Sequence, residues 1–301
     1  MNSTTEVIQY TTCVVCNSKN IELDFPTQDY SVSGEAFEIY KCKDCSFHFT
    51  QAIPAPEAIG RYYKSEDYIS HSNTKKGLIN QLYHVVRDYM LGKKHQLVKS
   101  LAKGNQLLDI GCGTGHFLNF MKEKGYQTQG VEVDDDARAF GQKEFGLDVS
   151  SPAALFDGSL NSPFDAITMW HVLEHIHLLD DNMKAIRSLL ADDGFLIIAV
   201  PNRESYDAQY YKQHWAAYDV PRHLWHFSPT TMDKIASKNG FRIQSLSKLP
   251  FDSFYTSLLS EKYKENKLFL FSGFTIGLLS YLKSVMDVKK ASSVIYIMQK
   301  S

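Results

Sequence analysis

The chain lacks a strong excess of charge of either sign. Its 301 residues hold 32 Lys plus Arg against 34 Asp plus Glu, which gives a formal net charge of −2. Nucleic-acid phosphates attract proteins with an excess of positive charge, so the composition argues against a general nucleic-acid binder. With 44% hydrophobic and 22% charged residues, the chain has the composition of a soluble globular protein of one large or two modest domains.

Long hydrophobic segments and repeats are also missing. Residues 1–6 contain neither a basic stretch nor an apolar one, so we expect no signal peptide. The longest uncharged apolar run, residues 268–282, has 15 residues. A membrane-spanning helix needs about 20. The expected location is therefore cytoplasmic.

Cysteine is scarce, and its spacing is informative. Four of the five cysteines form two C-x2-C pairs, Cys13/Cys16 and Cys42/Cys45, with 25 residues between the pairs. In a cytoplasmic chain this spacing favours a structural zinc site over disulfides, because four thiolates complete a tetrahedral shell. The alternative is a set of buried or redox-active cysteines. The fifth cysteine, Cys112, lies outside the pairs.

Residues 107–117, LLDIGCGTGHF, combine a short apolar strand, an acid and three glycines at alternate positions. Glycine is used where the backbone has positive φ or lies directly against a ligand, so a ligand is expected on this turn. One alternative is a nicotinamide dinucleotide, whose fingerprint is G-x-G-x-x-G/A. Here His116 stands where that fingerprint needs a small residue.

The charges around the turn favour a cationic ligand. Asp109 precedes the glycines, Glu132 ends the next expected strand, and residues 134–136 are all Asp. These carboxylates would repel a pyrophosphate and attract a cation. The turn resembles the first motif of class I S-adenosylmethionine (SAM) methyltransferases, whose cofactor carries a sulfonium and an ammonium group. The resemblance implies that Glu132 binds both ribose hydroxyls.

From residue 105 the sequence alternates strand and helix patterns, which predicts a doubly wound, mostly parallel α/β sheet. The resemblance implies seven strands in a Rossmann-like sheet whose last strand is antiparallel. We divide the chain into five parts: a small N-terminal zinc-ribbon-like module (1–60), a connector and helix (61–104), the SAM-binding core (105–250), an apolar helical insertion (251–290) and the final core strand (291–301).

Residues 164–176, FDAITMWHVLEHI, resemble the fourth-strand region of quinone-biosynthesis methyltransferases of the UbiG/UbiE type. By this resemblance His171 faces the transferred methyl group. Histidine has the pKa of a general base near neutral pH, and the alternative is a role in lining the site. Glu174 and His175 are expected to orient the turn, with a Glu/His metal site as the alternative.

The two resemblances together imply one set of cofactor contacts, which includes the glycine turn, the acids beside it and the end of the fourth strand. The predicted cofactor-binding residues are Asp109, Gly111, Cys112, Gly113, Gly115, Glu132, Val133, Met169 and Trp170.

Residues 215–229 follow the fifth strand and hold two tryptophans among several hydrogen-bonding side chains. Such a loop at the carboxyl edge of the sheet is typical of a functional site. We predict that Asp219, Arg222 and His223 form a wall of the site, with His223 as the second candidate base. The alternative is an Asp219–Arg222 ion pair that supports the loop. Two further candidates for substrate contact, Tyr68 and His71, follow the zinc module.

The insertion at 251–290 contains the 15-residue apolar run, with lysines at 262, 264 and 267 before it and at 283, 289 and 290 after it. One expectation is a helical hairpin packed on the domain, or a contact between two copies of the chain. The other is a lid for a lipophilic substrate or a peripheral contact with a membrane.

The predicted activity is transfer of a methyl group from SAM to a small aromatic or lipophilic acceptor, by O- or C-methylation. The expected cofactors are SAM and a structural Zn²⁺, and the expected partner is a small molecule rather than a nucleic acid. Two alternatives are an rRNA or tRNA methyltransferase with a zinc module, and a non-catalytic SAM-binding scaffold. Residues 1–60 hold three Lys, no Arg and eight Asp plus Glu, which disfavours RNA binding.

Overall fold

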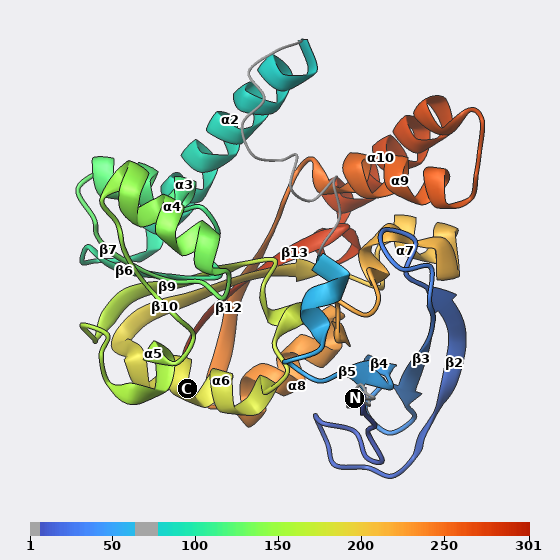
Figure 1. Ribbon diagram of the computed structural model, residues 1–301, viewed down its shortest axis with the longest axis horizontal. Coiled ribbons are helices and arrows are strands. Elements are labelled where there is room, and N and C mark those ends of the chain that lie inside the picture. The colour runs from blue at the N-terminus through green and yellow to red at the C-terminus, as the bar shows by residue number, and fades with distance from the viewer. Residues whose placement is uncertain (1–6, 64–77) are drawn as a thin grey trace, which may run out of the picture.

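Figure 1 shows a computed structural model of the protein, which describes residues 7–63 and 78–301; for residues 78–84 only the helical backbone is described. Two of the predicted substrate contacts, Tyr68 and His71, lie outside the described residues.

Seven strands form the central sheet, in the order β12-β13-β10-β9-β6-β7-β8. Strands β6 to β10 pair in parallel, whereas β13 is antiparallel to both β10 and β12. The predicted mostly parallel sheet with an antiparallel last strand is therefore confirmed. The bounds are β6 (Gln106–Ile110), β7 (Gln127–Val131), β8 (Asp148–Ser150), β9 (Phe164–Trp170), β10 (Leu190–Pro201), β12 (Phe241–Lys248) and β13 (Ser293–Lys300).

Helices cover both faces of this sheet (Figure 1). On one face lie α2 (Leu78–Leu101), α3 (His116–Glu123) and α4 (Asp135–Phe145), and on the other lie α5 (Ala154–Asp157), α6 (Leu179–Leu189) and α8 (Pro229–Lys238). Local signals explain where several of them begin. The carboxylate of Asp134 caps α4 by accepting a hydrogen bond from the Ala137 amide, and Ser228 begins α8 with a capping box followed by proline.

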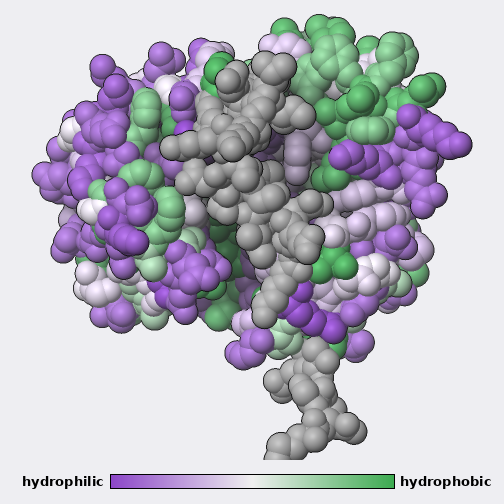
Figure 2. Space-filling view, turned by 45° about the horizontal axis from the view of Figure 1, so that its top comes forward, coloured by the Kyte–Doolittle hydropathy of each residue, from purple (hydrophilic) through white to green (hydrophobic). Residues whose placement is uncertain are grey.

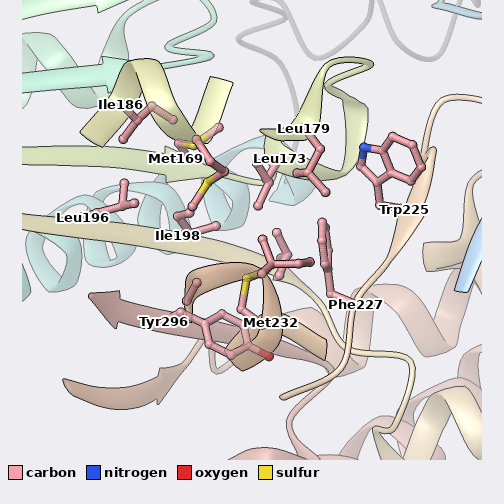
Figure 3. Packing of buried hydrophobic residues seen from close by; sticks show 14 of the residues in the cluster. Met169, Leu173, Leu179, Ile186, Leu196, Ile198, Trp225, Phe227, Met232 and Tyr296 are labelled. Carbon is pink, nitrogen blue, oxygen red and sulfur yellow. The ribbon is translucent and has the colours of Figure 1, made fainter. Parts of the chain in front are cut away.

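The hydrophobic core lies on both sides of the sheet because successive side chains of a strand point to opposite faces. In β10, Ile198 packs toward α6 and α8, while its neighbour Ile197 packs toward α2 and α3. Figure 3 shows the first of these clusters, in which Met169 and Ile198 lie close to Met232 and Phe227.

The N-terminal strands do not form a separate unit. A four-stranded sheet has the order β11-β4-β3-β2, and its edge strand β11 comes from the core. Phe47 and Phe49 therefore share one buried cluster with Trp225 and Phe227. The bounds are β2 (Ile21–Gln28), β3 (Ala36–Cys42), β4 (His48–Gln51) and β11 (Trp225–His226); β1 (Val7–Ile8) pairs with β5 (Ile53–Pro54), and η1 (Ile59–Tyr63) follows.

The predicted insertion contains two helices, α9 (Asp252–Tyr263) and α10 (Phe269–Met286), which pack against each other as a hairpin, and the short η5 (Val288–Lys290). The hairpin rests on α7 (Tyr206–Tyr211) and on η4 (Ala216–Tyr218), while η2 (Leu173–His175) and η3 (Lys212–His214) complete the elements of the described chain.

Candidate functional site

The glycine turn between β6 and α3 leaves part of its backbone open. Gly111 and Gly113 have φ values of 71° and 54°, which is the left-handed region that favours glycine. A side chain at Gly111 would overlap Val172, whereas a Cβ at Gly113 would meet no atom within 4 Å. Gly111 is thus required for packing, and the peptide at Gly113 faces space that a ligand can fill.

The Glu132 carboxylate lies directly beside this opening. Its Oε2 accepts a hydrogen bond from the Gly113 amide at 2.7 Å, and its Oε1 accepts from the amides of Val133 and Asp134 at 2.8 and 3.0 Å. Glu132 is buried, whereas the Val133 side chain is exposed. The backbone thus holds a buried carboxylate in one orientation next to the open peptide.

Asp109 supplies a second buried carboxyl group, below the same turn. It accepts a hydrogen bond from the Thr168 hydroxyl at 2.6 Å. Burial raises the pKa of Asp109 to about 7, against the effects of Thr168 and of the Lys94 ammonium, which lower it. A bound cation would favour the ionised form of this acid, so Asp109 is suited to a positively charged ligand.

Trp170 ends β9 at the same edge of the sheet. Its indole Nε1 is buried without a hydrogen-bond partner, and the edge-to-face ring contact with Phe117 places it against α3. The Lys94 ammonium lies 4.3 Å from the Trp170 ring. Lys94 was not among the predicted site residues, because nothing in the sequence around it distinguishes it from other lysines of a long helix.

A cavity of about 220 Å³ borders Trp170 on the side of α2 and β12. Apolar side chains and three lysines share its lining, among them Tyr89, Leu97, Leu249, Lys93, Lys94 and Lys248.

Two of the other predicted cofactor residues, Met169 and Cys112, pack against other parts of the protein. Met169 is fully buried, and Figure 3 shows its side chain among Ile186, Leu173 and Ile198, in the core on the α6 face. Its side chain is thus on the opposite face from α3. The Cys112 thiol lies against Gly130, where a side chain at that glycine would collide with it.

His171 sits between two carboxylates. Its Nδ1 is 3.2 Å from Glu174 Oε1, and its Nε2 is 3.0 Å from Asp252 Oδ2 at the start of α9. Burial alone would lower the pKa of His171, but the two carboxylates outweigh it and raise that pKa to about 10. In this arrangement His171 is an imidazolium at neutral pH, rather than the neutral base expected from the residue type.

The backbone of His171 is also unusual, since its φ of 58° is rare for a residue other than glycine. The His171 amide donates to the Ala199 carbonyl, which holds this conformation together with the two carboxylates. Such conformations persist where the surroundings enforce them, and they are frequent at functional sites.

Glu174, His175 and His223 lie together behind His171. Their ligand atoms are within 4.8 Å of one another, and Glu174 Oε2 is buried without a hydrogen-bond partner. Burial and the neighbouring His223 lower the pKa of His175 to about 4, so His175 is neutral. The three side chains could hold a metal ion, which is the alternative that the sequence left open for Glu174 and His175.

Arg222 is bound on all sides by protein groups. Its guanidinium donates two hydrogen bonds to Asp219, one to Asp29, which directly follows β2, and one to the Tyr62 carbonyl, at 2.7 to 2.9 Å. It is almost completely buried. These bonds form the supporting ion pair of the structural alternative.

The four paired cysteines meet at one point. The Sγ atoms of Cys13 and Cys45 are 3.4 Å apart, and those of Cys16 and Cys42 are 3.5 Å apart. All four lie within 4.8 Å of one another. Tetrahedral zinc, with zinc–sulfur bonds of about 2.3 Å, has sulfur atoms about 3.8 Å apart, so the geometry suits such an ion.

Comparison with known proteins agrees with this geometry. A family described as a methyltransferase domain matches residues 83–246, which is more than half of the chain. Among solved structures, magnesium protoporphyrin IX methyltransferase from Synechocystis PCC 6803, with bound SAH, matches with a TM-score of 0.53 at 13% identity. That match covers 81% of this chain and all of the other, and it shows that the fold is shared.

Two curated relatives are methyltransferases by name. An uncharacterized methyltransferase from Staphylococcus carnosus is 30% identical over 131 residues, which cover 42% of this chain and 61% of that protein. A ubiquinone biosynthesis O-methyltransferase from Pelagibacter ubique is 25% identical over 185 residues, covering 56% of this chain and 73% of that protein. The chain spans less than two thirds of the first relative's length. By the family match, the sheet order and the glycine turn, the chain belongs to the class I SAM-dependent methyltransferases.

Proposed function

We propose that the protein transfers a methyl group from SAM to an oxygen atom of a small aromatic or lipophilic acceptor. The observation that carries this proposal is the open peptide at Gly113, which donates to the buried Glu132 carboxylate and follows the buried Asp109 of β6. The Pelagibacter relative is named as an O-methyltransferase, which supports methylation at oxygen.

The residues around the turn have distinct roles in this proposal. Glu132 would hold the ribose hydroxyls, and Asp109 would balance the positive charge of the cofactor. Bound SAM supplies an electrophilic methyl group. Trp170 and Lys94 would close the cofactor site on the side of α2, since both line the cavity that borders this site.

The cavity beside Trp170 is the proposed acceptor site. Its apolar lining would shield a flat or lipophilic acceptor from water. Its three lysines would attract an acceptor that carries an acidic group. Holding the acceptor oxygen in line with the methyl group is the main contribution that such a pocket makes to the rate.

A hydroxyl acceptor also has to lose its proton. Both ring nitrogens of His171 are protonated in this arrangement. The imidazole therefore accepts the proton of the acceptor hydroxyl only after it has passed one of its own protons to Asp252 or Glu174. The three side chains form a proton-holding unit at the end of β9, with His223 behind it as a second candidate base.

Binding of SAM tests the cofactor assignment. Titration calorimetry should show SAM binding to the wild type and a loss of about 100-fold in the E132Q variant, because two hydrogen bonds to a charged carboxylate are weakened. The D136A variant removes an exposed acid on α4 and should bind like the wild type. Thermal unfolding of each variant checks that the turn is intact. Binding of NAD in place of SAM would overturn the assignment.

The protonation of His171 can be measured without knowing the acceptor. In the wild type, the NMR resonance of its imidazole should remain that of the protonated form up to about pH 9, because two carboxylates hold the proton. In D252N that pKa should fall by at least about one unit, since one carboxylate is lost.

The NMR resonance that is missing in the H171Q variant is the one that belongs to the His171 imidazole. The D287N variant, which removes an acid that follows α10 and caps η5, serves as the matched control and should leave the pKa of His171 unchanged. The same titration midpoint in D252N and the wild type would contradict the pairing of His171 with Asp252.

We also propose that Cys13, Cys16, Cys42 and Cys45 bind one structural Zn²⁺. Four thiolates fill the tetrahedral shell, which leaves no position for a substrate. The two knuckles are built alike, since the residues that follow Cys16 and Cys45, Asn17 and Ser46, both adopt positive φ. The zinc would stabilise a small sheet whose own core is limited.

A further inference from the structure

Helix α10 turns its small residues toward the protein. The residues of its buried face are Gly273, Ile276, Gly277, Ser280 and Ser284. A Cβ on Gly273 or on Gly277 would lie 2.8 Å from a backbone Cα of α9, so the two helices touch there. The Ser280 hydroxyl donates to the buried Asp207 of α7 at 2.6 Å, which fixes α10 to the rest of the protein along this face.

The opposite face of α10 is apolar and exposed to solvent. Phe271, Val285 and Met286 are 76%, 61% and 85% exposed. Exposed apolar side chains recur at positions 271, 274, 278, 282 and 285, a spacing that places them in one stripe along the helix. Figure 2 shows this surface as a continuous hydrophobic patch over the hairpin. A water-soluble surface helix has the reverse arrangement, with its apolar stripe buried.

By length and composition alone, α10 could cross a membrane, since its mean hydropathy is 1.4 over 18 residues. Only 28% of that window is buried, which is unlike the core helix of a soluble protein. The contacts with α9 and α7 hold one side of α10 against the protein, so in this fold the helix can only lie along a membrane surface.

The charges around the stripe are complementary to anionic lipid. Residues 262–290 carry six lysines against two acids, Glu265 and Asp287, whereas the whole chain has a net charge of −2. A second copy of the chain fits this surface less well, because two such stripes in contact would bring the flanking lysines of both copies together.

We propose that the exposed face of α10 docks on the surface of a membrane that contains anionic lipid. The apolar stripe enters the boundary between headgroups and acyl chains, and the flanking lysines contact the phosphates. The same hairpin carries Asp252, and Phe251 before it packs on Tyr89 of the cavity lining. Docking would therefore bring the cavity close to lipophilic molecules dissolved in the bilayer.

Flotation of the full-length protein with lipid vesicles tests the proposal, in the absence of SAM. We expect binding to vesicles of phosphatidylcholine with phosphatidylglycerol, and about tenfold weaker binding to phosphatidylcholine alone. The F271E/F274E variant should lose at least about tenfold in binding to the anionic vesicles, because it places charge in the apolar stripe.

The matched control is F156E/L178E, which changes two exposed apolar residues outside the hairpin and should bind like the wild type. The K267Q/K283Q variant should weaken binding to the anionic vesicles alone. An unchanged thermal unfolding midpoint shows that each variant is folded.

Equal binding by the wild type and F271E/F274E, or no binding to either vesicle, would overturn the proposal. The proposal would also be overturned if the wild type does not bind vesicles but forms a dimer by analytical ultracentrifugation, and if the F271E/F274E substitutions dissociate that dimer. Because no cofactor is present in these measurements, their failure leaves the proposed methyl transfer untouched.

Discussion

Replacing Cys16 by serine is expected to remove zinc from the protein and to destabilise its N-terminal sheet by several kcal/mol. Cys16 is exposed, and an exchange of an exposed thiol without a ligand role changes the free energy of unfolding by less than about 0.5 kcal/mol. A structural zinc site contributes an apparent binding free energy of about 10–16 kcal/mol, and the loss of one of its four ligands removes much of this.

The zinc content of purified protein and its tryptophan fluorescence measure the effect. Trp225 packs on Phe47, which lies two residues after Cys45, so disorder in the cluster should change its emission. The C112S variant removes the fifth cysteine and should retain about one zinc per chain. Metal-free wild type with native fluorescence would show that the cysteines serve another purpose.

Replacing Arg222 by alanine is expected to destabilise the protein by about 3–5 kcal/mol, since a buried ion pair that loses one partner leaves an unpaired buried charge. Asp29 is fully buried and Asp219 is mostly buried, and both would lose their guanidinium. The exchange also removes the contact with the Tyr62 carbonyl, which joins η1 to the core.

Denaturation by urea measures this difference. The matched control is R61A, which breaks an ion pair with Glu35 between two exposed side chains and should cost less than about 1 kcal/mol. A loss in R222A no greater than that in R61A would contradict the role of Arg222 in joining the two sheets.

The loss of stability caused by R222A should be smaller at acid pH. Burial raises the pKa of Asp29 and of Asp219, but the Arg222 guanidinium outweighs it and holds both pKa values below the ordinary range. The stabilisation is therefore present above the unfolded pKa near 4 and is lost as the pH falls through the folded pKa values. Below about pH 4 the wild type and R222A should become more alike in stability.

Several features could be predicted because they depend on residues close together in the chain. The glycines at 111, 113 and 115 meet a local need for positive φ, and the alternation of strand and helix patterns predicts the parallel sheet directly. The spacing of the two C-x2-C pairs likewise predicts two knuckles, and the structure brings them together.

Other features depend on residues that are distant in the chain and have no local signal. Strand β11 completes the N-terminal sheet by pairing with β4, almost 180 positions earlier in the sequence, so no composition boundary near residue 60 could reveal the shared core. Arg222 pairs with Asp29 across 193 positions, a contact that no local pattern of the sequence indicates.

His171 shows most clearly what the sequence by itself determined and what the tertiary structure decided. The sequence places a histidine after the fourth strand, beside the expected methyl-transfer site, and it identifies the acids of the glycine turn that suit a cationic cofactor. It does not reveal that Asp252, 81 positions later, lies 3.0 Å from the imidazole. The pKa of a partly buried group depends on which charges surround it in space, so only the folded chain decides that His171 holds its proton.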